Sequence, residues 1–314
     1  MKHIIVDCDT GIDDSIAILY ALKSKKLHVE GFTTVYGNTS SIQAAENTLR
    51  LIKLAKCGYD IPVIPGANES LAGDVDPYPV HIHGNNGIGN VELPESEQKP
   101  LNEDAADFII RKAEELEGDL IVVTLGRLTN MAAALEKDPR LPYKIKHLVA
   151  MGGAFHKPGN ISAYAEANIY GDAKASDIVF RAGFPMTVVG LDVTMETFIS
   201  ARDISLLGKY CREENREIVQ YMQSALEYYF QFSYESMGCL DCSVVHDPLA
   251  MLIAEDPSIG EYRMVRAAVE YENKEFRGMI KMDEDFIPIY DHDEIQYCIR
   301  VDSGLAVRKL LSVF

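Results

Sequence analysis

Residues 3–14 have the sequence HIIVDCDTGIDD, and this stretch decides the fold class. The apolar run within His3–Asp9 predicts a buried strand, and Asp13–Lys23 places apolar side chains at helical spacing. Gly11 supplies the backbone freedom that a turn between the two elements needs. A buried strand that turns into an amphipathic helix is the usual beginning of a parallel α/β sheet.

The same alternation continues along the chain. Apolar runs predict strands at Val29–Tyr36, Ile61–Ile64, Leu120–Leu125, His147–Met151 and Met186–Leu191. Helical spacing predicts helices at Ser41–Lys56 (capped by Gly58), Glu103–Glu117, Asn130–Glu136, Ala173–Ala182 and Pro248–Ala254, and a mainly helical segment at Ile204–Met237. Near the C-terminus we expect a terminal helix after antiparallel strands at Met264–Tyr271, Phe276–Met282 and Ile295–Val301.

We therefore expect a single α/β domain over residues 1–314, with a mostly parallel, Rossmann-like open sheet flanked by helices and with C-terminal antiparallel strands. Two irregular stretches, Pro65–Pro100 and Gly152–Gly171, interrupt the pattern. Loops of such length inside a compact domain are usually functional or disordered. Ligands of such sheets bind outside the carboxyl ends of the strands, so the polar residues after the predicted strands form the candidate site.

Composition excludes several classes of partner. The formal net charge of −18 repels nucleic acid and anionic membranes, which favours a neutral small molecule or a cation as ligand. No apolar stretch approaches the roughly 18 residues that span a membrane, and the run before Asp7 is too short for a signal peptide. Six scattered cysteines suit a reducing cytoplasm, and we interpret the lone Cys239–Cys242 pair as incidental thiols.

Four carboxylates, Asp7, Asp9, Asp13 and Asp14, fall within eight residues at the end of the first predicted strand. Crowded carboxylates raise one another's pKa unless a cation binds them. Hard oxygen ligands favour Mg²⁺ or Ca²⁺ over zinc or copper. Stabilisation of a helix N-terminus explains Asp13 and Asp14 but not the other two, so the stretch predicts a metal site.

The N-terminal pattern Asp-x-Asp-x-Gly-x-Asp-Asp resembles that of the inosine-uridine-preferring nucleoside hydrolase family. Six further pieces similar to that family follow in order along most of the chain. They are Thr33–Asn38 (TTVYGN), His83–Gly89 (HGNNGIG), Gly126–Asn130 (GRLTN), Met151–Gly153 (MGG), Asn160–Asn168 (ending in AEAN) and His246–Pro248 (HDP). The resemblance implies an enzyme that cleaves the N-glycosidic bond of a ribonucleoside with water.

The resemblance also implies a role for each matching residue. Ca²⁺ would be held by the side chains of Asp9, Asp14 and Asp247 and by the backbone carbonyl of Leu125, with Asp7 in or beside the coordination sphere. Remaining coordination positions would go to a water and to the ribose 2′- and 3′-hydroxyls, which suit calcium's flexible geometry. The residues expected to hydrogen-bond the sugar are Asp13, Asn38, Asn160, Glu166 and Asn168.

Cleavage develops positive charge on the ribose ring, which nearby carboxylates such as Asp13 and Glu166 stabilise. Asp9 would act as general base on a metal-bound water. His246 would protonate the leaving base, because an ordinary histidine pKa of about 6.5 permits proton donation near neutrality. The loop residue His83 is expected to contact substrate from a mobile lid, and Tyr228 or Tyr229 to stack on the base.

Departures from the family's commonest pattern leave base preference open between inosine/uridine and pyrimidine nucleosides. Thr10 and Arg127 replace prolines, Asn86 replaces an aspartate, and Ala167 replaces a phenylalanine near the sugar. The resemblance also implies a homodimer or homotetramer, and the cysteine usage noted above predicts a cytoplasmic protein. A non-catalytic or altered-specificity riboside-binding protein remains an alternative. A phosphatase of the Asp-x-Asp-x-Thr type is disfavoured, because Gly11 stands at the threonine position.

Overall fold

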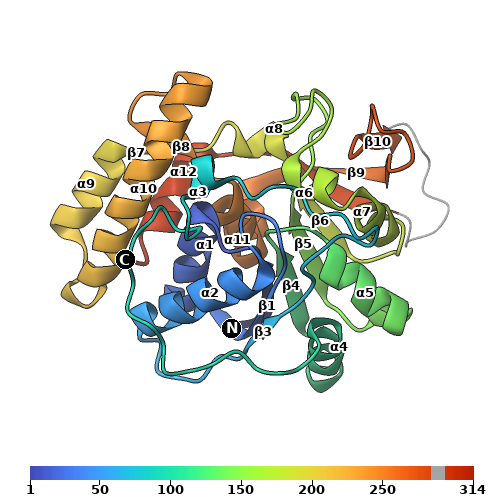
Figure 1. Cartoon of the computed structure of the whole chain (residues 1–314), viewed down its shortest axis with the longest axis horizontal. Coiled ribbons are helices and arrows are strands. Elements are labelled where there is room, and N and C mark those ends of the chain that lie inside the picture. The colour runs from blue at the N-terminus through green and yellow to red at the C-terminus, as the bar shows by residue number, and fades with distance from the viewer. Residues whose placement is uncertain (284–293) are drawn as a thin grey trace.

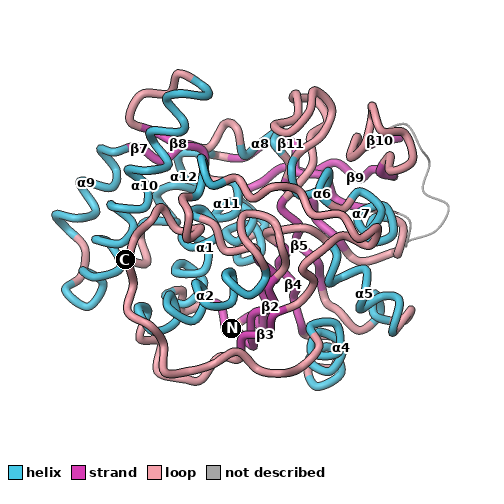
Figure 2. The backbone as a smooth tube through the Cα atoms, viewed as in Figure 1, coloured by secondary structure: helices cyan, strands magenta, loops and turns pink. Residues whose placement is uncertain are grey.

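The computed structural model describes residues 1–283 and 294–314, and within them nine strands form one sheet (Figures 1 and 2). Their order is β10-β9-β11-β6-β5-β4-β1-β2-β3. Their bounds are β1 Lys2–Cys8, β2 Leu27–Thr34, β3 Val63–Pro65, β4 Leu120–Thr124, β5 His147–Met151, β6 Met186–Val189, β9 Gly260–Val269, β10 Ile280–Asp283 and β11 Ile295–Val301. The pairs from β3 to β11 are parallel, and β9 runs antiparallel to β11 and β10, as expected.

Helices cover both faces of the sheet. The helices are α1 Ile12–Lys23, α2 Ser41–Ala55, α3 Val80–His83, α4 Ala105–Glu115, α5 Thr129–Lys137, α6 Ala167–Gly171, α7 Ala173–Phe180, α8 Leu191–Thr194, α9 Ala201–Tyr210, α10 Arg216–Met237, α11 His246–Glu255 and α12 Ser303–Leu311. One core cluster joins α1, α2, α10 and α11 to the sheet, and a second joins α4, α5 and α7 to its other face (Figure 1).

The central strand β1 shows why the first apolar run folds as it does. Ile4 and Val6 point into the first cluster and Ile5 into the second, and all three are fully buried. A strand buried on both faces needs a nearly continuous apolar run, which is typical of parallel sheets. Because β1 pairs with β2 and β4 in parallel, the segments after all three strands meet at one edge of the sheet.

The structure corrects several predicted boundaries. Helix α2 ends with Lys56 in the left-handed conformation (φ 51°), so Gly58 is not its cap. The segment Ile204–Met237 contains two helices, α9 and α10, because Cys211 and Arg212 between them have extended backbone angles (ψ 156° and 145°). The buried amide of Asn215 donates to the carbonyl of Phe314, a partner almost a hundred residues away that no local pattern reveals.

The two irregular stretches also contain short elements that periodicity does not predict. Helix α3 lies within Pro65–Pro100, and α6 begins near the end of Gly152–Gly171. A separate two-stranded sheet pairs β7, Phe198–Ser200, with β8, Cys242–Val244. In the described part of the chain no helix is long and apolar enough to cross a membrane.

The interpretation of Cys239 and Cys242 as incidental thiols is wrong for this structure, which joins them in a disulfide. Gly238 ends α10 with a positive φ of 67°, and Asp241 follows with φ 54°, so the chain turns sharply before β8. The turn brings the two α-carbons to 5.8 Å, a separation at which disulfides form.

Candidate active site

A cavity of about 490 Å³ opens at the edge of the sheet where β1, β2, β4 and β5 end. Asp9 follows β1, Asn38 follows β2, Leu125 follows β4, and Met151 ends β5, and all four residues line the cavity. The opposite wall comes from α3, α10 and the start of α11. The cavity thus lies outside the carboxyl ends of the parallel strands, where the sequence placed the candidate site.

One end of the cavity holds a cluster of buried carboxylates. Asp13 and Asp14 begin α1, and Asp247 begins α11. One oxygen from each lies within 4.8 Å of the other two, and each residue is at most 5% exposed. Three carboxylates so close together and so well shielded from water are the arrangement expected for a hard divalent cation.

Asp9 lies beside this cluster and is held by Asn38. Its Oδ2 accepts the backbone N–H of Asn38 at 2.8 Å, and its Oδ1 accepts the Asn38 side-chain amide at 3.2 Å. The same amide donates to Oδ2 of Asp14 at 3.0 Å, so Asn38 links the two aspartates. A Cβ at Gly37 would collide with Asp9 Oδ2, which is why only glycine permits this approach.

Burial and mutual repulsion shift the titration of these acids. Burial, followed by the charge of Asp14, raises the pKa of Asp9 well above its usual range and that of Asp13 to about 7. Burial and the neighbouring Asp13 likewise raise the pKa of Asp247. Oδ1 of Asp14 is buried without a hydrogen-bond partner. A divalent cation would offset the repulsion among the carboxylates and would give Oδ1 of Asp14 a partner. These carboxylate oxygens therefore fit Ca²⁺.

Asp7 lies outside the carboxylate cluster. Its Oδ1 accepts Thr33 Oγ1 at 2.6 Å and the Asn130 amide at 2.7 Å, and it does not line the cavity. Burial raises its pKa to about 7. Asn130 also donates to the carbonyl of Thr34, so Asp7 ties together the ends of β1 and β2 behind the cavity.

Glu166, Asn168 and Leu125 form the wall next to the carboxylates. Glu166 caps α6, its two oxygens accepting the backbone N–H groups of Gly153, Asn168 and Ile169 at 2.9–3.2 Å. The Asn168 side chain donates to the Leu125 carbonyl at 2.7 Å. The structure therefore brings these three predicted residues together, with the Leu125 carbonyl in a polar environment.

Asn160 lies at the rim rather than inside the cavity. It is exposed, and its Oδ1 accepts the backbone N–H of Ala167 at 3.0 Å. This contact fixes the 160–168 loop, from which Asn160, Glu166 and Asn168 all line the cavity.

At the other end, the cavity is largely apolar. Tyr229 of α10 is buried and lines the wall, with its ring stacked on Phe232 at 6.2 Å between centroids. Tyr228 does not line the cavity, because its hydroxyl donates to the Val80 carbonyl at 3.0 Å on another side of α10. Of the two tyrosines proposed to stack on a base, only Tyr229 is in position to do so.

His83 is more firmly fixed than a residue on a mobile lid. It is 5% exposed, and its Nδ1 accepts the backbone N–H of Ile12 at 3.1 Å. This contact places the ring hydrogen on Nε2. Burial, followed by the charge of His246, lowers the pKa of His83 to about 3, so the ring is neutral at pH 7.

His246 lines the apolar end of the cavity, and its Nδ1 lies 2.8 Å from the hydroxyl of Thr194. Burial lowers the pKa of His246 to about 4, below the ordinary value that the sequence suggested. At neutral pH the ring is therefore uncharged. It still carries one N–H, and a hydroxyl that donates to Nδ1 leaves that hydrogen on Nε2.

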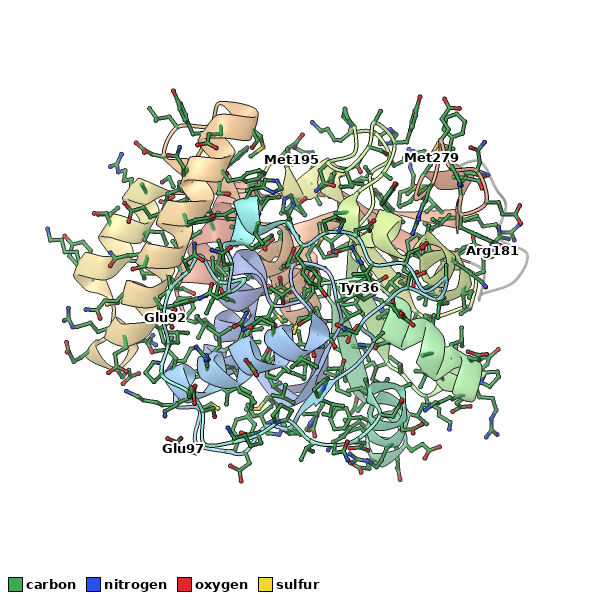
Figure 3. All side chains as sticks on the ribbon, viewed as in Figure 1. Tyr36, Glu92, Glu97, Arg181, Met195 and Met279 are labelled. Carbon is green, nitrogen blue, oxygen red and sulfur yellow. A yellow bond between two sulfur atoms is a disulfide. The ribbon has the colours of Figure 1, made fainter. Side chains whose placement is uncertain are left out.

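Sequence reasoning missed several residues that line this cavity or contact its lining. Thr194 ends α8 and is far from His246 in the sequence, so only the fold reveals their contact. Arg127 was noted as a replacement for proline, but its guanidinium stacks 4.0 Å from the Tyr36 ring centre and pairs with Asp76 at 3.2 Å. Figure 3 labels Tyr36 and also Met195, which lines the apolar end.

Comparisons with known proteins agree on one family. A family model described as inosine-uridine preferring nucleoside hydrolase matches residues 4–304. Uridine nucleosidase 1 of Arabidopsis thaliana is 38% identical over 272 residues, which cover 86% of this chain and 79% of that protein. The pyrimidine-specific ribonucleoside hydrolase RihA of Salmonella paratyphi B is 33% identical over 284 residues, covering 90% and 89%. The structure of the purine-preferring ribonucleoside hydrolase from Gardnerella vaginalis has a TM-score of 0.92 and 32% identity, covering 99% and 98%.

Proposed function

Because this chain belongs to the inosine-uridine preferring nucleoside hydrolase family, we propose that it hydrolyses ribonucleosides to ribose and free base with Ca²⁺, and prefers uridine and inosine. It is a nucleoside hydrolase, an enzyme that acts on the N-glycosidic bond of nucleosides. The proposed use of Ca²⁺ and the proposed substrates rest on the difference between the two ends of the cavity. One end has a buried carboxylate cluster, and the other has an apolar wall that includes His246. We also propose that residues 1–314 act as one domain.

The sugar end fits a ribose bound at a cation. Asp9, Asp14, Asp247 and the Leu125 carbonyl would hold Ca²⁺, which when bound polarises a water and binds vicinal hydroxyls. Asp9 is within reach of this region and would accept the proton of the attacking water. Its contacts to Asn38 keep the carboxylate in one orientation for that task.

Positive charge develops on the ribose as the N-glycosidic bond breaks. Asp13 lines the cavity beside Asp14 and Asp247, so its carboxylate lies within reach of a bound sugar. Glu166 adds a second negative charge on the neighbouring wall, fixed in place by three backbone N–H groups. Such preorganised charges stabilise the transition state without having to reorganise.

The base end fits a planar heterocycle that leaves with extra electron density. Tyr229, Phe232 and Met195 supply apolar surface for the ring. His246 would donate its Nε2 hydrogen to the departing base. The neutral ring expected from its lowered pKa acts here as a hydrogen-bond donor, not as a cationic acid. Uridine as preferred substrate is supported by the names of the similar plant proteins, whereas the similar Gardnerella structure is called purine-preferring.

The proposal is tested by measuring ribose released from uridine, cytidine, inosine, adenosine and guanosine with Ca²⁺ and after chelation. Uridine and inosine should give the highest kcat/KM, and chelation should abolish release from every nucleoside, since the buried carboxylates are then left to repel one another. Turnover that survives complete metal removal would contradict the calcium proposal. Folded, calcium-loaded protein that releases no ribose would point to a riboside-binding protein instead.

Thr194 should act as a positioning residue for His246. Replacing Thr194 with valine keeps the shape of the side chain but removes the hydroxyl that contacts Nδ1. Because a neutral hydrogen bond contributes about 1 kcal/mol, we expect kcat for uridine to fall roughly fivefold to tenfold, and Thr194→Ser to restore it.

A purely structural role for Thr194 would affect all substrates alike. p-Nitrophenyl riboside separates the two explanations, because its leaving group departs without help from an acid. We expect Thr194→Val to leave turnover of this substrate within about twofold of the wild type. An equal loss on uridine and on p-nitrophenyl riboside would rule out the positioning role.

A further inference from the structure

Two histidines and a glutamate gather at the opposite edge of the sheet from the cavity. One ligand atom from each of His3, His28 and Glu30 lies within 4.8 Å of the other two. His3 Nδ1 is 2.7 Å and His28 Nε2 is 3.6 Å from the same oxygen, Oε1 of Glu30. Both histidine side chains are 37% exposed, so the cluster is open to solvent.

Strand pairing produces this cluster. His3 near the start of β1 is the register partner of His28 near the start of β2. The register then shifts by one residue, since Ile4 pairs with Val29 but Ile5 pairs with Gly31. Glu30 is the extra residue of this bulge. Bulges redirect side chains, and this one turns the carboxylate towards both imidazoles.

Surrounding residues hold the three side chains in place. The His28 ring stacks on Tyr59 with 4.8 Å between centroids, and the Tyr59 hydroxyl accepts the backbone N–H of Val29 at 3.2 Å. The other oxygen of Glu30, Oε2, accepts Lys112 Nζ at 3.0 Å. Lys112 therefore binds one oxygen of Glu30, and the other oxygen, Oε1, is left to bind a metal. Carboxylates that bind metals are commonly hydrogen-bonded in this way.

We propose that His3, His28 and Glu30 bind a borderline divalent transition metal, of which Zn²⁺ is the natural probe. Two imidazole nitrogens and one carboxylate oxygen are ligands that zinc takes in tetrahedral sites with a water in the fourth position. Zinc bonds of 2.0–2.2 Å place neighbouring ligand atoms about 3.3 Å apart, between the 2.7 and 3.6 Å found here. Ca²⁺ prefers oxygen and would not compete.

The site is separate from the calcium site in place and in chemistry. Asp9 lies six positions after His3, which is about 20 Å of extended chain at 3.3 Å per residue. A metal here crosslinks β1 and β2 where both strands begin. A ligand that binds only the folded state stabilises it by mass action, so the site would act as a clamp on the sheet edge.

The test is a Zn²⁺ titration of the full-length protein in saturating Ca²⁺, by calorimetry and by thermal unfolding. His28→Gln removes one ligand, and Glu30→Gln removes a second in case the first variant folds poorly. His147→Gln is the matched control, because His147 lies on the same sheet edge but contacts Thr187 and not the cluster.

The wild type and His147→Gln should each bind one more equivalent of Zn²⁺ than His28→Gln, or bind that equivalent at least tenfold more tightly. Adding zinc should raise the Tm of the wild type and of His147→Gln but not that of His28→Gln or Glu30→Gln. Identical zinc isotherms for wild type and for both ligand variants would overturn the proposal. Turnover of uridine with Ca²⁺ should be unchanged in His28→Gln, so the outcome is independent of the proposed catalytic roles.

Discussion

Replacement of Asp9 with asparagine is expected to lower kcat for uridine about 10³- to 10⁴-fold, with KM within a few-fold of the wild type. Asparagine keeps the size of the side chain and one oxygen that can ligate calcium, but it cannot accept the proton of water. Asn38 donates to both oxygens of Asp9, so the asparagine keeps one of these two contacts, through its remaining oxygen. Steady-state kinetics with Ca²⁺ at saturation measures the effect.

Calcium affinity must be measured on the same variant, because Asp9 is proposed both as ligand and as base. Calorimetry should show Ca²⁺ binding within about tenfold of the wild type. Asp76→Asn is a matched control, since Asp76 lines the same cavity and pairs with Arg127 but is not one of the clustered carboxylates. A variant whose lost turnover is fully restored by more Ca²⁺ would show that Asp9 serves as a ligand alone.

The sheet could be predicted from sequence because its strands are buried on both faces. Residues 4–6 of β1 must be apolar because they pack on both faces of the sheet, and such a run is visible without a structure. The break between α9 and α10 could not be predicted in this way. Helical spacing continues on both sides of it, and the start of α10 is held by a bond from buried Asn215 to Phe314, a contact distant in the sequence.

The carboxylate cluster could be predicted in part, since Asp13 and Asp14 follow a strand and a turn. The role of Asp7 could not be separated from that of Asp9, because residues two apart in an extended strand share one side. In the structure β1 ends at Cys8, so Asp9 lies beyond the strand and Asp7 within it. Asp7 instead accepts a hydrogen bond from Asn130. The sequence identifies the motif that contains Asn130 but does not reveal this contact. Tyr228 and Tyr229 are adjacent on a helix, so at most one can face the cavity, and packing decides which.

Removal of the His246 side chain should show the second large effect. We expect His246→Ala to lower kcat for uridine about 10²- to 10³-fold, the typical cost of losing one donor to a developing charge. The imidazole lines the base end, and its Nδ1 is already engaged by Thr194, so Nε2 is the donor that the variant loses. Alanine retains the helical start of α11, where Asp247 must remain in position.

Leaving-group dependence distinguishes this role from damage to the neighbouring cluster. p-Nitrophenyl riboside needs the same sugar contacts and the same water but no donor to its leaving group, so His246→Ala should hydrolyse it within about fivefold of the wild-type rate. His81→Ala serves as control, because His81 is exposed beside the cavity and should affect neither substrate. If His246→Ala lost both activities equally, Asp247 would have been displaced and the donor would have to be sought elsewhere. Tyr229 would be the next candidate, because its buried hydroxyl lies along the same wall.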